Sequence, residues 1–195
     1  MPRIEAALPP AGRVLEIGCG HGLFSVYAAL AGPGRAVVGV DIDADKIALA
    51  QQVAAGLPCL DLTFRITESG AVPAGPWDAI VIVDVLYLLP AGAQRALLAA
   101  AGSELAPDGV LLVKEMSQTP RWKAAWNRTQ ETLAVSVLGL TERDGSAPEL
   151  FDFVDPDTMA RWLRDDGMWT AQQRLDRHRP HPHLLLLARR SEPAA

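Results

Sequence analysis

The strongest constraint on the fold is a regular alternation of short apolar runs with helix-like segments across residues 13–115. The apolar runs predict buried strands, because a parallel strand covered on both faces presents no polar side. The segments between them predict helices that end at glycine or proline. We expect strands at Val14–Ile17, Ala36–Val40, Leu62–Ile66, Asp78–Val83 and Val110–Lys114, and helices at His21–Ala31, Asp43–Ala55 and Ala91–Leu105. This alternation indicates an α/β fold, with a mostly parallel sheet between two helical layers.

The second half of the chain predicts a different arrangement. Thr119–Leu140 has the composition of a helix that is rich in Trp, Arg and Lys at its start, and we expect residues of about 117–150 to form a lid-like helical insertion. Asp155 and Pro156 predict the start of another helix, as N-cap and first helical residue. Trp169–Leu175 and Leu184–Ala188 predict a hairpin, so one of its strands should be antiparallel to the rest. We expect residues 1–195 to form a single domain.

Composition and charge argue against several classes of protein. Hydrophobic residues make up 49% of the 195 residues, which fits a packed domain rather than a disordered chain. No apolar run approaches the ~20 residues of a membrane-spanning helix, and two cysteines form neither a disulfide framework nor a zinc motif. The net charge of −5 argues against a nucleic-acid binder, although Arg174–Arg190 is locally basic and suits an anionic substrate. Met1–Pro10 has no apolar core of signal-peptide length, so we expect a cytoplasmic protein.

A glycine-rich turn, VLEIGCGHG at Val14–Gly22, follows the first expected strand. Gly18 permits a tight turn, Gly20 allows a ligand to approach the backbone, and Gly22 allows close packing where a helix begins. Free amides at a helix N-terminus also favour an anionic group. The simpler interpretation is a turn that only requires small residues. The next strand, however, ends at Asp41, whose carboxylate can accept both hydroxyls of a ribose.

Four segments together resemble the successive motifs of the class I S-adenosylmethionine (SAM)-dependent methyltransferases. They are VLEIGCGHG, VVGVDID at Val37–Asp43, DAIVIVDVLYLLP at Asp78–Pro90 and LAPDGVLLVKE at Leu105–Glu115. The resemblance implies a Rossmann-like, mostly parallel seven-stranded sheet whose last strand is antiparallel. It also implies methyl transfer from SAM, which leaves S-adenosylhomocysteine (SAH) as product. The GxGxG spacing differs from the GxGxxG of dinucleotide-binding enzymes.

The resemblance further implies roles for individual residues. The loop that holds the methionine part of SAM corresponds to Glu16, Gly18, Cys19, Gly20, His21 and Gly22. Asp41 would bind the ribose, Ile42 would pack on the adenine, and Glu68 would face the adenine amino group. Asp84 and Val85 would lie beside the methionine moiety, and Tyr87 near the transferred methyl group. Thr67-Glu68-Ser69 departs from the family's usual Gly-Asp-Ala, and the segment before Arg13 is shorter than in most relatives.

The candidates for acid–base chemistry and substrate contact lie at strand ends and in the insertion. Methyl transfer depends mainly on orientation, and a base adds to the rate when the acceptor must lose a proton. His178 and His181 are candidate bases in the hairpin loop, although two prolines also fit an ordinary solvated turn. Glu115 is a third candidate, or else a surface carboxylate paired with Lys114 or with a neighbour. No acid or cysteine completes a metal site with the loop histidines, so we expect no metal.

Trp122 and Trp126 stand four residues apart and share one face of the expected helix. They could pack on the core, form an aromatic wall for the substrate, or make a homodimer contact. We expect SAM-dependent methyl transfer to a small molecule, at oxygen or nitrogen, with neither nucleic acid nor a membrane span involved. The alternatives are a methyltransferase that acts on a protein or RNA, and a non-catalytic subunit with the same fold.

Overall fold

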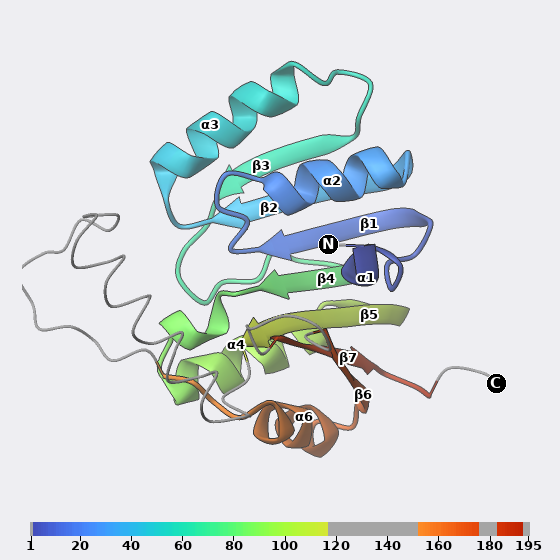
Figure 1. The fold of residues 1–195 in the computed structure, drawn as a ribbon, viewed down its shortest axis with the longest axis vertical. Coiled ribbons are helices and arrows are strands. Elements are labelled where there is room, and N and C mark those ends of the chain that lie inside the picture. Colours follow the sequence, from blue (N-terminus) through green and yellow to red (C-terminus); the bar gives the residue numbers. More distant parts are fainter. Residues whose placement is uncertain (1, 117–151, 176–182, 193–195) are drawn as a thin grey trace, which may run out of the picture.

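A computed structural model describes residues 2–116, 152–175 and 183–192. They contain one seven-stranded sheet with the order β3-β2-β1-β4-β5-β7-β6 (Figure 1). The strands are β1 (Ala11–Ile17), β2 (Gly34–Asp41), β3 (Leu62–Ile66), β4 (Trp77–Val83), β5 (Leu105–Met116), β6 (Trp169–Arg174) and β7 (His183–Arg189). Strand β7 is antiparallel to both β5 and β6, and the other neighbouring pairs are parallel. The expected mostly parallel sheet with an antiparallel last strand is confirmed.

Helices cover both faces of this sheet. They are α1 (Pro2–Glu5), α2 (Leu23–Ala31), α3 (Ala44–Ala55), the 3-10 turn η1 (Leu86–Leu88), α4 (Ala91–Ser103) and α6 (Pro156–Asp165). Alternate residues of β4 belong to two separate cores. Ile80 and Ile82 pack with α4 and α6, whereas Ala79 and Val81 pack with α1 and α2. The two cores explain why β4 is apolar on both faces.

Local chemistry explains where most of the helices begin. The side chain of Asp43 accepts hydrogen bonds from the Asp45 and Lys46 amides and caps α3. Asp155 accepts from the Asp157 amide at the start of α6, as its sequence predicts. The expected start of α2 at His21 is wrong by two residues. Gly22 is its N-cap and adopts a left-handed conformation with φ of 77°, so the helix begins at Leu23.

Strand β5 begins earlier than the sequence predicts. Leu105 already pairs with Trp77, the register then shifts, and pairing resumes where Val110 lies opposite Ala79. Residues 106–109, which precede the expected strand, therefore form an irregularity within β5. A helix at Thr119–Leu140 and the hairpin loop that carries His178 and His181 lie outside the described residues, as do Trp122 and Trp126.

The strand order places one sheet edge in the position of a ligand site. The chain runs outward from β1 through β2 to β3 and then returns to β4 on the other side of β1. The order therefore reverses beside β1, and ligands of such sheets bind beyond the carboxyl ends of the strands at this point. Since β7 is antiparallel, its first residue, His183, lies at the same edge opposite Met116. No helix within the described ranges is long and apolar enough to cross a membrane.

Candidate functional site

The glycine-rich turn joins β1 to α2 at this edge and is tied to the end of β2. The Gly18 and Cys19 amides donate to the Val40 carbonyl at 2.8 and 3.0 Å. All three glycines of the turn have positive φ angles, 72° at Gly18, 53° at Gly20 and 77° at Gly22. Residues with a side chain rarely adopt this conformation, so the backbone path itself requires glycine.

The three glycines differ in what surrounds them. A Cβ atom at Gly18 would lie 2.3 Å from the Val85 Cγ2 atom, and one at Gly22 would lie 2.4 Å from the Phe64 ring. These two glycines allow close packing of the protein against itself. A Cβ atom at Gly20 would meet no atom within 4 Å. Gly20 therefore presents bare backbone to open space, as the approach of a ligand requires.

Asp41 faces this open backbone from the end of β2. Its Oδ2 atom accepts from the Gly20 amide at 2.7 Å, and its Oδ1 atom accepts from the Asp43 amide at 3.0 Å. A carboxylate has about four acceptor positions, so both oxygens can still accept ribose hydroxyls. Ile42 follows with 63% of its surface exposed, although it is apolar. The open turn, the acid and the exposed apolar side chain together fit the adenosine part of SAM.

Glu16 is the most strongly perturbed carboxyl at this edge. It lies on β1 with 4% of its surface exposed, and its Oε2 atom accepts from the Ser25 hydroxyl of α2 at 2.5 Å. Burial is the main cause that raises the pKa of Glu16 to about 8; the hydrogen bonds from Ser25 oppose this shift, and the charge of Asp41 adds to it. Glu16 thus links the glycine turn to the first turn of α2 and can change charge near neutral pH.

The perturbed carboxyl predicts that the folded state loses stability as the pH rises. Between about 4.5 and 8, native Glu16 keeps a proton that the unfolded chain has lost. The unfolded state binds fewer protons there, so the free energy of unfolding falls with rising pH. At roughly 1.4 kcal/mol per pKa unit, the ionisation of Glu16 should lower the free energy of unfolding by on the order of a few kcal/mol across this pH range. Denaturant unfolding from pH 5.5 to 8.5 should show a shallower decline for Glu16→Gln. Identical slopes for the two proteins would contradict the prediction.

The turn after β4 lies beside the glycine turn. Asp84 has a φ angle of 55°, which is unusual for a residue with a side chain, and its carboxylate forms an ion pair with Lys114 of β5. Its amide donates to the Lys114 carbonyl at 2.9 Å. Glu115 is 4% exposed, and its Oε1 atom accepts from the Val85 and Leu86 amides at 3.0 and 2.7 Å. The interpretation of Glu115 as a surface carboxylate is wrong, because Glu115 is buried, and the ion pair of Lys114 is with Asp84.

Tyr87 begins an aromatic wall at the same edge. Its ring stacks on the ring of Phe153, with centroids 5.3 Å apart and planes 8° from parallel. Hydrogen bonds of the neighbouring residue Asp152 hold the chain around Phe153 in place. The Asp152 amide donates to the Tyr87 carbonyl at 3.0 Å, and the Asp152 carboxylate accepts from the Ala91 amide at 2.8 Å. Asp152 directly follows residues 117–151, so this wall lies at the junction of the expected insertion.

The remaining sequence candidates occupy less distinctive positions. His21 is exposed in the glycine turn, and Glu68 is exposed just after β3. Cys19 is buried, and burial raises the pKa of its thiol to about 12, so it stays protonated. Sequence reasoning missed the roles of Ser25, Lys114 and Phe153. Among the described residues, no three His, Cys, Asp or Glu side chains gather into a metal-binding group.

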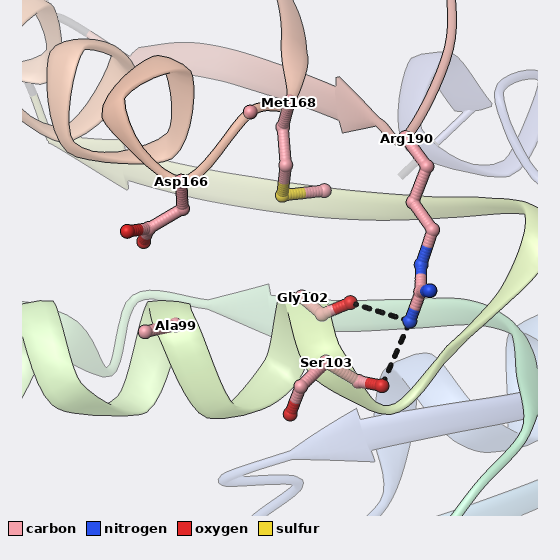
Figure 2. Close-up of a pocket in the computed structure, with 7 residues that line it drawn as sticks. Ala99, Gly102, Ser103, Asp166, Met168 and Arg190 are labelled. Carbon is pink, nitrogen blue, oxygen red and sulfur yellow. Dashed lines mark hydrogen bonds between the residues drawn. The ribbon is translucent and has the colours of Figure 1, made fainter.

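A cavity of about 450 Å³ lies at the other end of the strands, the amino ends of the parallel strands, where α4 and α6 end. Figure 2 shows Arg190, which follows β7, reaching across the last turn of α4. Its guanidinium donates to the carbonyls of Gly102 and Ser103 at 3.3 and 2.8 Å. Met168 and Asp166 lie on the other side of the cavity. This cavity is separated from the glycine turn by the length of the strands.

The geometry agrees with comparisons to known proteins. A family model described as a methyltransferase domain matches residues 1–172. The chain belongs to this methyltransferase family. A relative named ubiquinone biosynthesis O-methyltransferase, from Xanthomonas axonopodis pv. citri (strain 306), is 29% identical over 172 residues. The match covers 85% of this chain and 66% of the relative, so this chain spans slightly less than two thirds of the relative's length.

Solved structures of methyltransferases share the fold. A SAM-dependent methyltransferase from Methanosarcina mazei superposes with a TM-score of 0.69 at 19% identity, covering 98% of this chain and 99% of that one. Magnesium protoporphyrin IX methyltransferase from Synechocystis PCC 6803, solved with bound SAH, superposes with a TM-score of 0.70 at 22% identity, covering 97% and 78%. The first of these proteins is named as SAM-dependent, and the second was solved with the product that SAM leaves after methyl transfer.

Proposed function

We propose that this chain transfers the methyl group of SAM to a hydroxyl oxygen of a small, planar acceptor. The observation that carries the proposal is the pairing of Gly20 with Asp41. The Gly20 amide is held 2.7 Å from the Asp41 carboxylate, and the space in front of Gly20 is free of protein atoms. A turn that only needed small residues would not also require an acid directed at it.

The residues of the chain would act mainly by binding and orientation. Bound SAM supplies a methyl carbon on a sulfonium, to which the acceptor oxygen bonds as the carbon–sulfur bond breaks and the hydroxyl proton leaves to a base. Asp41 would accept hydrogen bonds from the ribose, and Ile42 would cover one face of the adenine. The Gly20 backbone would lie against the methionine part. Holding two reactants in alignment is worth about 7–11 kcal/mol, so few other groups are needed.

Two observations support a planar hydroxyl compound as acceptor. The relative from Xanthomonas is named for O-methylation in ubiquinone biosynthesis. The ring of Tyr87, which follows Asp84 and Val85 in the chain, stacks on the ring of Phe153 and forms an aromatic surface with it. Aromatic surfaces bind flat rings well, at about 0.5–1.5 kcal/mol beyond the area that is buried. The proposed acceptor atom is therefore an oxygen on an aromatic or quinone-like ring.

Other features of the proposal concern residues that the structure does not describe. His178 and His181 belong to the segment that joins β6 to β7. The end of β6 and the start of β7 lie at the cofactor edge, which is our name for the carboxyl ends of the parallel strands, beyond which SAM would bind. The two histidines remain our candidates for the base. Trp122 and Trp126 remain candidates for a lid over the acceptor or for a homodimer contact. We place the protein in the cytoplasm.

Binding and turnover test the proposal separately. Calorimetric titration should show SAH binding and no NADH binding. With SAM labelled in its methyl group, phenolic acceptors should become labelled in preference to the matching anilines. Tyr87→Ala should raise the acceptor KM roughly 3- to 10-fold and leave the Kd of SAH unchanged. Tyr27→Ala, which removes the other tyrosine, from α2, is the matched control. An absence of SAH binding at millimolar concentration would overturn the cofactor, and preferred labelling of anilines would overturn the acceptor class.

A further inference from the structure

The turn after β4 is held by the end of β5 through a set of short-range contacts. The Asp84 amide donates to the Lys114 carbonyl, and the Lys114 ammonium pairs with the Asp84 carboxylate. The next two amides, of Val85 and Leu86, both donate to one oxygen of Glu115. Three consecutive residues of the turn are therefore bound to two consecutive residues of β5.

The position of this turn matters because it forms part of the wall of the glycine turn. The Val85 methyl groups occupy the space beside Gly18, where a Cβ atom would come within 2.3 Å. Any shift of the Val85 backbone would therefore move a side chain that lies directly against the cofactor loop. Asp84 is in a left-handed conformation, which persists only where neighbouring contacts enforce it.

We propose that Glu115 is a positioning residue for the cofactor site: its carboxyl group holds the Val85 and Leu86 amides and thereby seats Val85 against Gly18. This inference rests on the proposed function, because it assigns Glu115 to the site that would hold SAM. It differs from the role of a base that the sequence suggests, because here the Oε1 atom of Glu115 acts on two backbone amides and not on the methyl acceptor.

The charge state of Glu115 provides a signature that a packing role lacks. Burial raises the pKa of Glu115 to about 7. The Leu86 amide opposes this shift, the Asp84 charge adds to it, and the Val85 amide and Lys114 oppose it. Hydrogen bonds to an ionised carboxylate are about twice as strong as neutral ones, so the grip on the two amides should tighten as the pH rises through 7.

Two substitutions distinguish loss of the acceptor oxygen from loss of the carboxylate charge. Glu115→Ala removes the acceptor and leaves two buried amides unsatisfied, so the Kd of SAH should rise roughly 10-fold or more. Glu115→Gln keeps an acceptor oxygen and should stay within about 3-fold of the unmodified protein at pH 6. The control is Glu104→Ala at the opposite edge of the sheet, where a carboxylate likewise accepts a loop amide, from Gly75 at 2.6 Å. It should destabilise the protein and leave the Kd of SAH unchanged.

An amide NMR titration tests the contact without any cofactor. The proton shifts of Val85 and Leu86 should titrate together with an apparent pKa near 7 in the unmodified protein and lose this titration in Glu115→Gln. Flat shifts would overturn the inference, as would unchanged SAH affinity in folded Glu115→Ala or equal weakening by Ala and Gln. If the unmodified protein bound no SAH but the two amides titrated, the proposed function would fail and the contact would stand. If Glu115→Ala did not fold, the titration and Glu115→Gln would decide.

Discussion

Asp41→Ala should raise the Kd of SAH at least about 100-fold. The Asp41 carboxylate fixes the Gly20 amide and the Asp43 amide, and its free acceptor positions are those that ribose hydroxyls would occupy. Alanine removes both contributions at once. Each hydrogen bond to a charged group contributes about 1.5–3 kcal/mol, and two of them correspond to about 100-fold or more. Calorimetric titration with SAH is the direct measurement.

Asp43→Ala is the matched control for this substitution. Asp43 lies two residues further along the same loop, and its carboxylate also accepts two backbone amides, those of Asp45 and Lys46. Its removal should lower the free energy of unfolding by about 1 kcal/mol through loss of the helix cap and leave SAH binding almost unchanged. Equal SAH affinities in Asp41→Ala and Asp43→Ala would contradict the assignment of Asp41 to the ribose.

Gly20→Ala should weaken SAH binding at least roughly 10-fold while the protein remains folded. The φ angle of 53° imposes a backbone cost on alanine of about 1 kcal/mol. No protein atom lies within 4 Å of the new methyl group, so the substitution adds no clash within the protein itself. The methyl group would instead occupy the space in which the methionine part of SAM is proposed to lie. SAH titration and thermal unfolding measure the two effects separately.

Gly167→Ala separates backbone strain from loss of ligand space. Gly167 has a φ angle of 81° and open space around its Cα atom, as Gly20 does, but it follows α6 at the opposite edge of the sheet. The two alanine variants should lose similar stability, by about 1 kcal/mol, and only Gly20→Ala should lose SAH affinity. Equal SAH affinity in the two variants would exclude the space before Gly20 as a ligand site.

Most of the sheet was predictable because its signals are local. The five apolar runs of the first half and the two segments of the expected C-terminal hairpin all form strands. The Asp155-Pro156 pair marks the start of α6. The errors lie where backbone geometry decides. Gly22 adopts a left-handed conformation that delays α2, and nothing in the apolar periodicity distinguishes a helix residue from its cap. The irregularity in β5 likewise depends on its pairing with Trp77.

The site was predictable only as far as its motif extends. The glycines and Asp41 could be placed from the sequence because a turn and a strand end bring them together. The roles of Lys114 and Glu115 could not, because β5 is apolar on both faces and gives no sign of which end residue points inward. The Tyr87–Phe153 stack joins residues separated by more than 60 positions, and no local pattern links them.

The antiparallel direction of β7 has a consequence for how such a chain can diversify. Segment 117–151 follows Met116, which pairs with His183, and segment 176–182 lies between β6 and β7, where Arg174 pairs with Leu184. Residues 117–151 are followed by Asp152, whose amide bonds to the Tyr87 carbonyl. The hydrogen-bonded ladder closes directly beneath both junctions. Either segment can therefore change in length or sequence without shifting any strand register. Under the proposed function, changes in these two stretches would leave the residues proposed to bind SAM in place.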